Sequence, residues 1–543
     1  MTGLNNVVSN FKKNKTVPIL FSNSTRSKLP EICLKEKKLQ FHSNHKFLGI
    51  LFDKKLTWND HIQSIRNRCR KRINILKAVA GTSWGNKTKT LLMLYRSLIR
   101  SLLDYGCEAY DSASESAKQV LNSIQYASLR ICAGALHGTS LAALQVELNE
   151  PPLELRRKLL TYKYHAHLSQ IPAHPLKNKI QPCWQFEKLE NKKVRQPFGM
   201  RIKYVKPTED TVENLTLFPF PYWYTNTLSV STELTDLLTK SDDPNVKRIK
   251  SLELINSKWN NSLHIYTDGS KTPTGLASAS FYVPYFSIKQ SKGLSNNTSN
   301  YRAELAAISI ALEWIKQLNI HTDVVIFTDC LSALISLQSP NDNFATDILY
   351  NYTELLYKGT QVHMEWIPSH CGINGNEMAD HLAKQALQDE ITINNRLCLS
   401  EVSALLKLEL YEEWKKRWSN YHSETIRLFK PTISYNFECA LKRDSEVIIR
   451  RLRLNNIGLN ADPAKIWSSQ TSGNKNCKDC NTPETLIHYL TECPKYLIER
   501  AMLLTESNTV NPSDIIRLLK STEKTAQKAI VSFVLRTKRF EEI

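Results

Sequence analysis

The sequence has no apolar segment that is both long enough and free enough of charge to span a membrane. Its N-terminus, MTGLNNVVSNFKKNK, also lacks the apolar core of a signal peptide. No internal repeat or low-complexity tract stands out. We therefore expect a protein that is not secreted, has no membrane partner and works inside the cell, in the nucleus or the cytoplasm.

A dense disulfide framework is also absent. The twelve cysteines are scattered along the chain, with only one tight cluster, which favours a reducing intracellular compartment. With 543 residues and 41% hydrophobic content, the chain is long enough for several globular domains. The sequence gives no indication of the oligomeric state.

Acidic residues are scarce in the first part of the chain. Residues 1–250 hold 40 Lys and Arg against 20 Asp and Glu, a net charge of +20. Residues 251–400 hold 9 against 14, a net charge of −5, and residues 401–543 hold 23 against 18, a net charge of +5. Basic surfaces can be simple solubilising faces, but a polyanionic partner would be held mainly outside the acidic central region.

Four carboxylates in this central region stand in contexts that could bring them together. Asp268 ends the strand pattern HIYTDGS, and Asp329 ends the apolar run VVIFTDC. Glu304 and Asp380 lie in the helical patterns NYRAELAAISIALEWI and NEMADHLAKQAL. A single carboxylate is usually a solvated group or a helix cap. Two strands that each end in Thr-Asp, with acidic helices between and after them, favour a shared site.

Clustered carboxylates suit metal-assisted phosphodiester hydrolysis, in which two Mg²⁺ ions activate water and stabilise the leaving oxygen. Mg²⁺ takes hard oxygen ligands, so Asp and Glu serve better than Cys or His. Carboxylates this close repel one another and stay ionised together only around a cation. The spacing of strands and helices predicts an α/β fold, a mixed sheet with helices on both faces.

The motifs YTDGS, YRAEL, FTDC and PSHCGINGNEMAD resemble type 1 ribonuclease H in order, spacing and context, over Leu263 to Leu387. The resemblance implies that Asp268 bridges two Mg²⁺ ions, for which Mn²⁺ could substitute, and that Glu304 and Asp329 complete the ligand set. It implies that Asp380 holds the ion that activates water.

Two further residues near Asp380 enter this interpretation. His370, on the loop PSHCGINGN, matches the family's mobile histidine, which assists proton transfer or product release. Glu377, one turn before Asp380, is either an ordinary helix-face acid or a group that touches the metal site.

The resemblance also implies an RNA–DNA hybrid as substrate. The residues expected to read its 2′-hydroxyls are Gly269, Ser270, Asn300 and Arg302. Two departures predict a weaker grip on the hybrid. Cys330 follows Asp329 where several relatives carry a polar amide, and the link SPNDNFATD lacks the basic helix of some relatives. The basic N-terminal region would then supply part of the affinity for the hybrid.

The flanking segments resemble a reverse transcriptase of non-LTR retrotransposons. The stretch HKFLGILFDKKLTWNDHI is similar to the end of its palm and the start of its thumb. The basic run from Arg66 to Arg72 is either a solvated helix face, a phosphate-binding surface or a nuclear localisation signal. The single Asp-Asp pair, Asp242-Asp243 in TKSDDPNVK, lies in a polar stretch that is typical of a linker. We expect no polymerase activity from this chain.

A zinc site is predicted near the C-terminus by the spacing C-x2-C-x7-H-x4-C. Three thiolates and one imidazole at these intervals suit a structural, tetrahedral Zn²⁺. The ligands would be Cys477, Cys480, His488 and Cys493. The motif resembles the cysteine–histidine module found downstream of ribonuclease H in non-LTR retrotransposons, whose roles are stabilising the tail and binding nucleic acid.

Together these patterns predict six segments. They are a palm remnant (1–62), a helical thumb-like region (63–171), a linker (172–258), a ribonuclease H domain (259–392), a helical region (393–470) and a zinc-knuckle-like module with the tail (471–543). The predicted activity is endonucleolytic hydrolysis of the RNA strand in RNA–DNA hybrids. Two alternatives remain: a catalytically idle nucleic-acid-binding relic, and a DNA-cutting enzyme of the same fold, as in integrases and resolvases.

Overall fold

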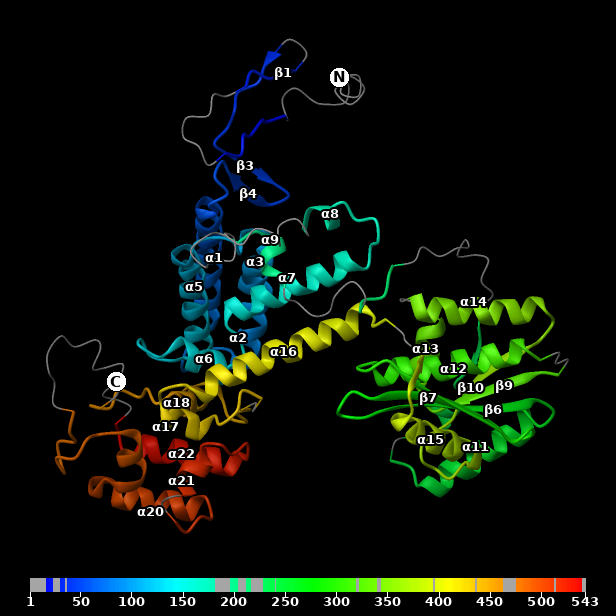
Figure 1. The fold of residues 1–543 in the computed structure, drawn as a ribbon. Coiled ribbons are helices and arrows are strands. Elements are labelled where there is room, and N and C mark those ends of the chain that lie inside the picture. Colours follow the sequence, from blue (N-terminus) through cyan, green and yellow to red (C-terminus); the bar gives the residue numbers. More distant parts are fainter. Residues whose placement is uncertain are drawn as a thin grey trace. The chain divides into compact units, whose positions relative to one another are not determined.

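The computed structural model forms two compact units (Figure 1). The helical unit comprises Met1–Tyr162, Ile180–Lys203 and Leu408–Ile543, and the sheet unit comprises Lys163–Lys179 and Tyr204–Lys407. The structure describes residues 16–22, 30–34, 37–180, 196–203, 211–215, 228–239, 241–318, 322–338, 343–393, 396–434, 437–461, 475–511 and 514–539. Within these ranges, no helix combines the length and apolar character needed to cross a bilayer.

The sheet unit is built on a mixed sheet, whose seven described strands have the order β11-β8-β7-β6-β9-β10-β5. Strand β7 runs antiparallel to both of its neighbours, β6 and β8, whereas β6, β9, β10 and β5 run parallel. The strands are β5 (Ser229–Ser231), β6 (Leu263–Lys271), β7 (Ala277–Val283), β8 (Ile288–Leu294), β9 (Val324–Thr328), β10 (Val362–Trp366) and β11 (Ile391–Ile393). The expected α/β fold with a mixed sheet is confirmed.

Helices cover both faces of this sheet, as strand β9 makes clear. Val324 and Ile326 pack in one apolar cluster, and Val325 and Phe327 pack in another. Because successive side chains of a strand point to opposite faces, the two clusters lie on the two sides of the sheet. The first holds α12 (Asn300–Lys316), α13 (Leu331–Gln338) and α14 (Asn343–Tyr357), and the second holds α11 (Pro244–Lys258) and α15 (Asn374–Gln385) (Figure 1).

Part of the segment expected to be a linker belongs to this fold. Strand β5 pairs with β10, and α10 (Leu234–Leu237) and α11 pack on the same side of the sheet. The Asp-Asp pair starts a helix here. The Asp243 carboxylate accepts a hydrogen bond from the Asn245 N–H at 2.8 Å, and Asp242 accepts one from the Thr239 N–H at 2.7 Å. A three-residue strand, Ser-Val-Ser, carries no apolar run that would reveal it in the sequence.

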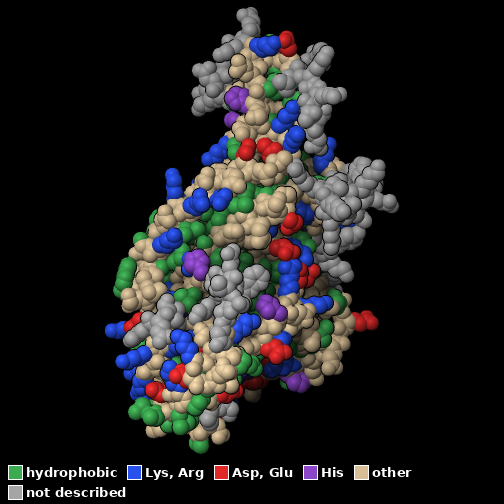
Figure 2. All heavy atoms as spheres, turned by 90° about the vertical axis from the view of Figure 1, so that its left-hand side faces the viewer, with side chains coloured by type: hydrophobic (Ala, Val, Ile, Leu, Met, Phe, Trp, Pro, Cys, Tyr) green, Lys and Arg blue, Asp and Glu red, His purple; other side chains and the backbone are tan. Residues whose placement is uncertain are grey.

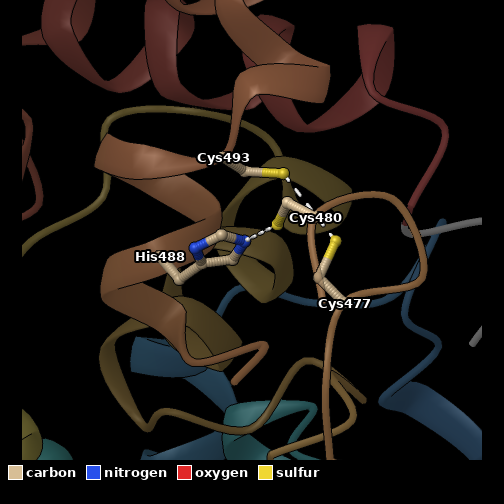
Figure 3. Close-up of side chains that lie close together, drawn as sticks. All are labelled: Cys477, Cys480, His488 and Cys493. Carbon is tan, nitrogen blue, oxygen red and sulfur yellow. Dashed lines mark hydrogen bonds between the residues drawn. The ribbon is translucent and has the colours of Figure 1, made fainter. Parts of the chain in front are cut away.

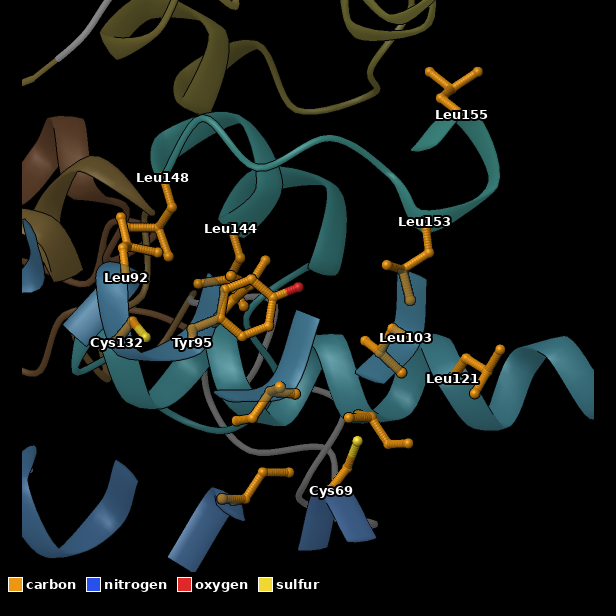
Figure 4. Packing of buried hydrophobic residues seen from close by; sticks show 14 of the residues in the cluster. Cys69, Leu92, Tyr95, Leu103, Leu121, Cys132, Leu144, Leu148, Leu153 and Leu155 are labelled. Atoms are coloured by element: carbon orange, nitrogen blue, oxygen red, sulfur yellow. The ribbon is translucent and has the colours of Figure 1, made fainter. Parts of the chain in front are cut away.

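The N-terminal part of the helical unit contains the helices that the sequence predicts over 63–171. They pack around an apolar core in which Tyr95 is fully buried (Figure 4). A hairpin of β3 (Asn44–Phe47) and β4 (Ile50–Asp53) leads into the first helix. The helices are α1 (Asn59–Val79), α2 (Thr88–Leu94), α3 (Ser101–Asp104), α4 (Cys107–Tyr110), α5 (Glu115–Ala133), α6 (Leu141–Glu147) and the first part of α7 (Leu153–Ser169), whose last residues belong to the sheet unit.

The C-terminal segments share this core. Trp414, Trp418 and Leu454 belong to the same apolar cluster as the N-terminal helices. The buried Glu147 carboxylate accepts hydrogen bonds from Arg450 and Arg453, each at 2.9 Å. The helices involved are the second half of α16 (Leu399–Ser419), whose first residues belong to the sheet unit, α17 (Glu424–Phe429), α18 (Arg443–Arg453), α20 (Leu497–Glu506), α21 (Asp514–Leu518) and α22 (Lys524–Arg536). Regions that the sequence separates into several segments therefore form one compact unit.

Candidate active site

Three of the four predicted carboxylates meet at one point of the sheet unit. Asp268 lies inside β6, Asp329 directly follows β9, and Glu304 lies near the start of α12. Thr267 and Thr328 are register partners on these neighbouring parallel strands, so the aspartates that follow them emerge side by side. Ligand oxygens of the three carboxylates lie within 4.8 Å of one another.

Burial and mutual repulsion make this cluster hard to ionise. Burial, with the nearby charges of Asp329 and Asp380, raises the pKa of Asp268 to about 8. Burial and the charge of Asp268 raise the pKa of Glu304 well above its usual range. Burial also raises the pKa of Asp329, although a hydrogen bond from the Asn376 amide at 3.3 Å opposes the rise. The donor set fits a hard divalent cation, which would keep all three groups ionised.

A close approach between strand and helix fixes the position of Glu304. The Gly269 N–H donates a hydrogen bond of 3.0 Å to the Glu304 carboxylate. A Cβ atom on Gly269 would lie 2.3 Å from the backbone nitrogen of Glu304. Glycine at this position therefore lets α12 come near enough to β6 for the carboxylates to converge.

The fourth carboxylate belongs to an adjacent group. Asp380, Glu377 and His370 each offer a ligand atom within 4.8 Å of the others. The Lys384 ammonium lies 2.6 Å from the Asp380 carboxylate, and Glu377 accepts a hydrogen bond from the Gly372 N–H at 3.2 Å. His370 is exposed and has a φ of 50°, on the loop before α15. Asp380 still adds to the negative field that raises the pKa of Asp268.

Residues 260–388 match the RNase H family. These residues form a ribonuclease H domain. The matched range contains every strand and helix that contributes the carboxylates described above. The family resemblance that the sequence motifs carry is thereby confirmed.

Two proteins of Drosophila melanogaster are similar to this chain over a wider stretch. One is the RNA-directed DNA polymerase from mobile element jockey, 28% identical over 167 residues, which are 30% of this chain and 17% of that protein. The other is the 115 kDa protein in type-1 retrotransposable element R1DM, 29% identical over 153 residues, or 28% and 15% of the two chains. The match thus covers less than a fifth of either relative.

Among the four residues expected near the 2′-hydroxyls of a hybrid, Arg302 has a buried side chain that is already paired within the sheet unit. Its side chain is only 4% exposed, and its guanidinium donates a hydrogen bond to Glu213 at 2.8 Å. Asn300 is exposed, Ser270 is half-buried and Gly269 is buried against α12. Asn300 and Ser270 therefore offer side-chain polar groups at the surface, whereas the Arg302 guanidinium is held inside the sheet unit. Part of the link SPNDNFATD, residues 339–342, lies outside the described residues.

The sequence interpretation missed two residues that contact the carboxylates. Asn376 donates a hydrogen bond to Asp329, and Lys384 pairs with Asp380. Positions 376, 380 and 384 are spaced by four along α15, so they share one face of the helix. This spacing is a signal by which the sequence could have revealed both residues.

The four predicted zinc ligands converge in the helical unit (Figure 3). Cys477 and Cys480 lie on a turn, and His488 and Cys493 lie at the two ends of a short helical segment. The Cys477 and Cys493 sulfurs are 3.8 Å apart, and the Cys480 sulfur is 3.2 Å from the His488 Nε2. Hydrogen bonds from Thr482 lower the pKa of Cys480, which favours its thiolate. The donors fit one Zn²⁺ ion.

Basic side chains are exposed along α1. Arg68, Arg70 and Lys71 face solvent, and Figure 2 shows lysine and arginine side chains spread over one face of the molecule. A groove of about 480 Å³ runs beside α1 and the β3–β4 hairpin. Its lining consists of Asn44, Leu51, Asp60, Gln63, Ser64, Asn67, Arg68 and Lys71. Its three amides, one hydroxyl and two cations can contact a phosphate backbone, and the Asp60 carboxylate opposes such contacts at one point of the groove.

Proposed function

We propose that this protein is a metal-dependent ribonuclease that hydrolyses the RNA strand of RNA–DNA hybrids. The observation that carries the proposal is the convergence of Asp268, Glu304 and Asp329, within a domain of the ribonuclease H family. Buried carboxylates that repel one another are costly for a fold to keep. A cation-binding role gives a physical reason for keeping them.

The roles of the residues follow from their places. Asp268, Glu304 and Asp329 would hold Mg²⁺, and two such ions supply an activated water and stabilisation of the leaving oxygen. Asp380 lies beside this set, with Lys384 holding its carboxylate. His370, exposed on its loop, can reach solvent and carry a proton between the site and bulk water. The expected products carry a 3′-hydroxyl and a 5′-phosphate.

The rest of the chain would serve binding. Both relatives are described as products of mobile elements, and we infer that this chain derives from a retrotransposon protein of that kind. Its helical unit corresponds to the thumb-like region and the zinc module in that interpretation. The exposed cations of α1 would hold the phosphate backbone, because each contact with a phosphate releases a bound counterion.

The test is cleavage of an end-labelled RNA–DNA hybrid by the full chain with Mg²⁺, beside double-stranded RNA and duplex DNA. The matched variant is Asp268→Asn, which removes one charge and keeps the shape of the side chain. We expect cleavage of the hybrid alone, its loss without Mg²⁺, and its loss in Asp268→Asn, with hybrid binding kept.

Each other outcome has a defined meaning. Hybrid binding without cleavage by the wild-type chain would overturn the enzymatic proposal and favour a nucleic-acid-binding relic. Cleavage of duplex DNA in place of the hybrid would favour the DNA-cutting alternative. Cleavage that persists in Asp268→Asn would place the activity outside the carboxylate cluster.

A further inference from the structure

The start of α12, which carries Glu304, is held by residues from outside the ribonuclease H family match at 260–388. The Glu401 carboxylate accepts a hydrogen bond of 2.6 Å from the N–H of Ser299, the residue that caps α12. The same carboxylate lies 3.6 Å from the guanidinium of Arg302, which is in the first turn of the helix. Glu213 accepts the 2.8 Å hydrogen bond from that guanidinium.

We propose that Glu213, Arg302 and Glu401, here called the α12 clamp, are positioning residues that set Glu304 for metal binding. The proposal rests on the proposed function, and it extends the functional unit beyond the residues that match the family. None of the three would touch the substrate or the metal. They act through the placement of the helix that carries Glu304.

Glu401 is well placed to hold a helix start. It lies in the first turn of α16, and its other oxygen accepts a hydrogen bond of 2.9 Å from the Cys398 N–H. One carboxylate thus binds N–H groups at the starts of two helices, where the helix dipole favours negative charge. Its side chain is 3% exposed, so water competes little for these bonds.

Glu213 reaches Arg302 because its own backbone is tied to the same region. The Glu213 N–H donates to the Leu397 carbonyl at 2.9 Å, and the Leu397 N–H donates to the Thr211 carbonyl at 2.8 Å. These bonds hold residues 211–215 beside the segment that leads into α16. The two acids of the clamp therefore come from opposite sides of the family match and meet on Arg302.

Small displacements of α12 would matter for the metal site. The backbone of Ala303 and Glu304 already lies against Gly269, as close as a glycine allows. A helix start released from the clamp would move away from β6, since no closer approach is possible. The Glu304 carboxylate would then leave the Gly269 N–H and the other two carboxylates. Groups that orient metal ligands typically change metal affinity by about 10-fold to 100-fold when they are removed.

The test uses the full chain and two readouts beside cleavage. One variant is Glu401→Gln, which removes the negative charge of the clamp carboxylate. The other is Arg302→Lys, which keeps the positive charge but loses the guanidinium group that contacts both acids. The control is Glu354→Gln, which removes the carboxylate paired with Lys316 at the other end of the same helix. The readouts are hydrogen–deuterium exchange of peptides covering 295–306 without metal, and Mg²⁺ affinity by calorimetry.

We expect Glu401→Gln and Arg302→Lys to speed exchange at 295–306 and to weaken Mg²⁺ binding by about 10-fold or more, with the control unchanged in both. Unchanged exchange and unchanged Mg²⁺ affinity in both clamp variants would overturn the proposal. So would equal effects in the control, because they would show only a general loss of stability. If the wild-type chain fails to cleave hybrids, the proposed function fails, while exchange and Mg²⁺ affinity still decide on the clamp.

Discussion

The Gly269 N–H donates a hydrogen bond to the Glu304 carboxylate at 3.0 Å, across a gap too narrow for a methyl group. The backbone of strand β6 therefore sets how near α12 can come to the sheet. It also sets the distance between Glu304 and Asp268, because Asp268 directly precedes Gly269 in β6 and Glu304 lies on α12 opposite them. The positions of these two carboxylates therefore depend on backbone packing as well as on charge.

Gly269→Ala should push α12 outward. The added Cβ would lie 2.3 Å from the Glu304 nitrogen, which is backbone and cannot rotate away. We expect a loss of about 1–3 kcal/mol in the free energy of unfolding from overpacking. We also expect a loss of about 100-fold in hybrid cleavage, because the displaced carboxylate holds metal poorly. Urea unfolding and cleavage assays measure the two effects.

Gly359→Ala is the matched control, because a Cβ there meets no atom within 4 Å although φ is 87°. It should lower stability by about 1 kcal/mol through backbone strain and leave cleavage intact. Equal losses of cleavage in the two variants would contradict the role given to the Gly269 contact.

The metal-free protein should lose stability as pH rises. Asp268 has a pKa of about 8 in the folded protein and about 4 in an unfolded chain, so the folded state binds its proton more tightly. The free energy of unfolding should therefore fall between about pH 4 and pH 8, by roughly 1–3 kcal/mol for this group. Thermal unfolding in chelator across this range measures it.

Asp268→Asn should flatten that pH dependence and be more stable than the metal-free wild type at pH 8. Mg²⁺ should stabilise the wild type at pH 8 but have much less effect on the variant, because one ligand is missing. Glu313→Gln, an exposed acid on α12, is the control and should follow the wild type. Parallel curves for wild type and Asp268→Asn would count against a strained carboxylate cluster.

Purified protein should contain one zinc ion per chain, measured by elemental mass spectrometry. Cys477→Ser should abolish zinc retention and lower the unfolding midpoint of the helical unit, because a structural zinc contributes directly to folding. Cys439→Ser, outside the cluster, should keep the ion. Hybrid cleavage per molecule should persist in Cys477→Ser, since the carboxylates lie in the sheet unit. Full zinc content in Cys477→Ser would refute this site.

Glu147→Gln should destabilise the helical unit strongly. Its carboxylate is buried between Arg450 and Arg453, and removing one charge leaves these guanidinium groups without full compensation. Breaking a buried pair in this way costs about 3–5 kcal/mol. Glu154→Gln, whose partner Arg417 is 41% exposed, should cost less than about 1 kcal/mol. Tryptophan fluorescence during urea unfolding distinguishes the two, and equal shifts would contradict the prediction.

The sequence predicted the carboxylate cluster because each member sits in a strong local pattern. Strand β9 is a run of β-branched and aromatic residues that ends in Thr-Asp, and α12 repeats apolar residues at helical spacing. Those patterns determine whether a segment is a strand or a helix, and this in turn determines the direction in which each side chain points. Asp268, Glu304 and Asp329 could therefore be placed together without any knowledge of the tertiary structure.

Arg302 could not be placed in the same way. Its partners Glu213 and Glu401 are far from it in the sequence, and no local pattern links them. Strand β5 escaped prediction because it is held by pairing with β10 and not by apolar character of its own. In both cases the deciding interaction is between distant segments, which a single sequence does not display.

The helical unit is discontinuous in the chain, and this has a consequence for its synthesis. Glu147 is made before the whole of the ribonuclease H domain, and its partners Arg450 and Arg453 are made after it. The ribosome must therefore finish the domain in between before the buried charges can meet. The ribonuclease H domain can fold as a unit while the helical unit still lacks its C-terminal residues. During that interval Glu147 depends on water, and on whatever binds the nascent chain, to solvate its charge.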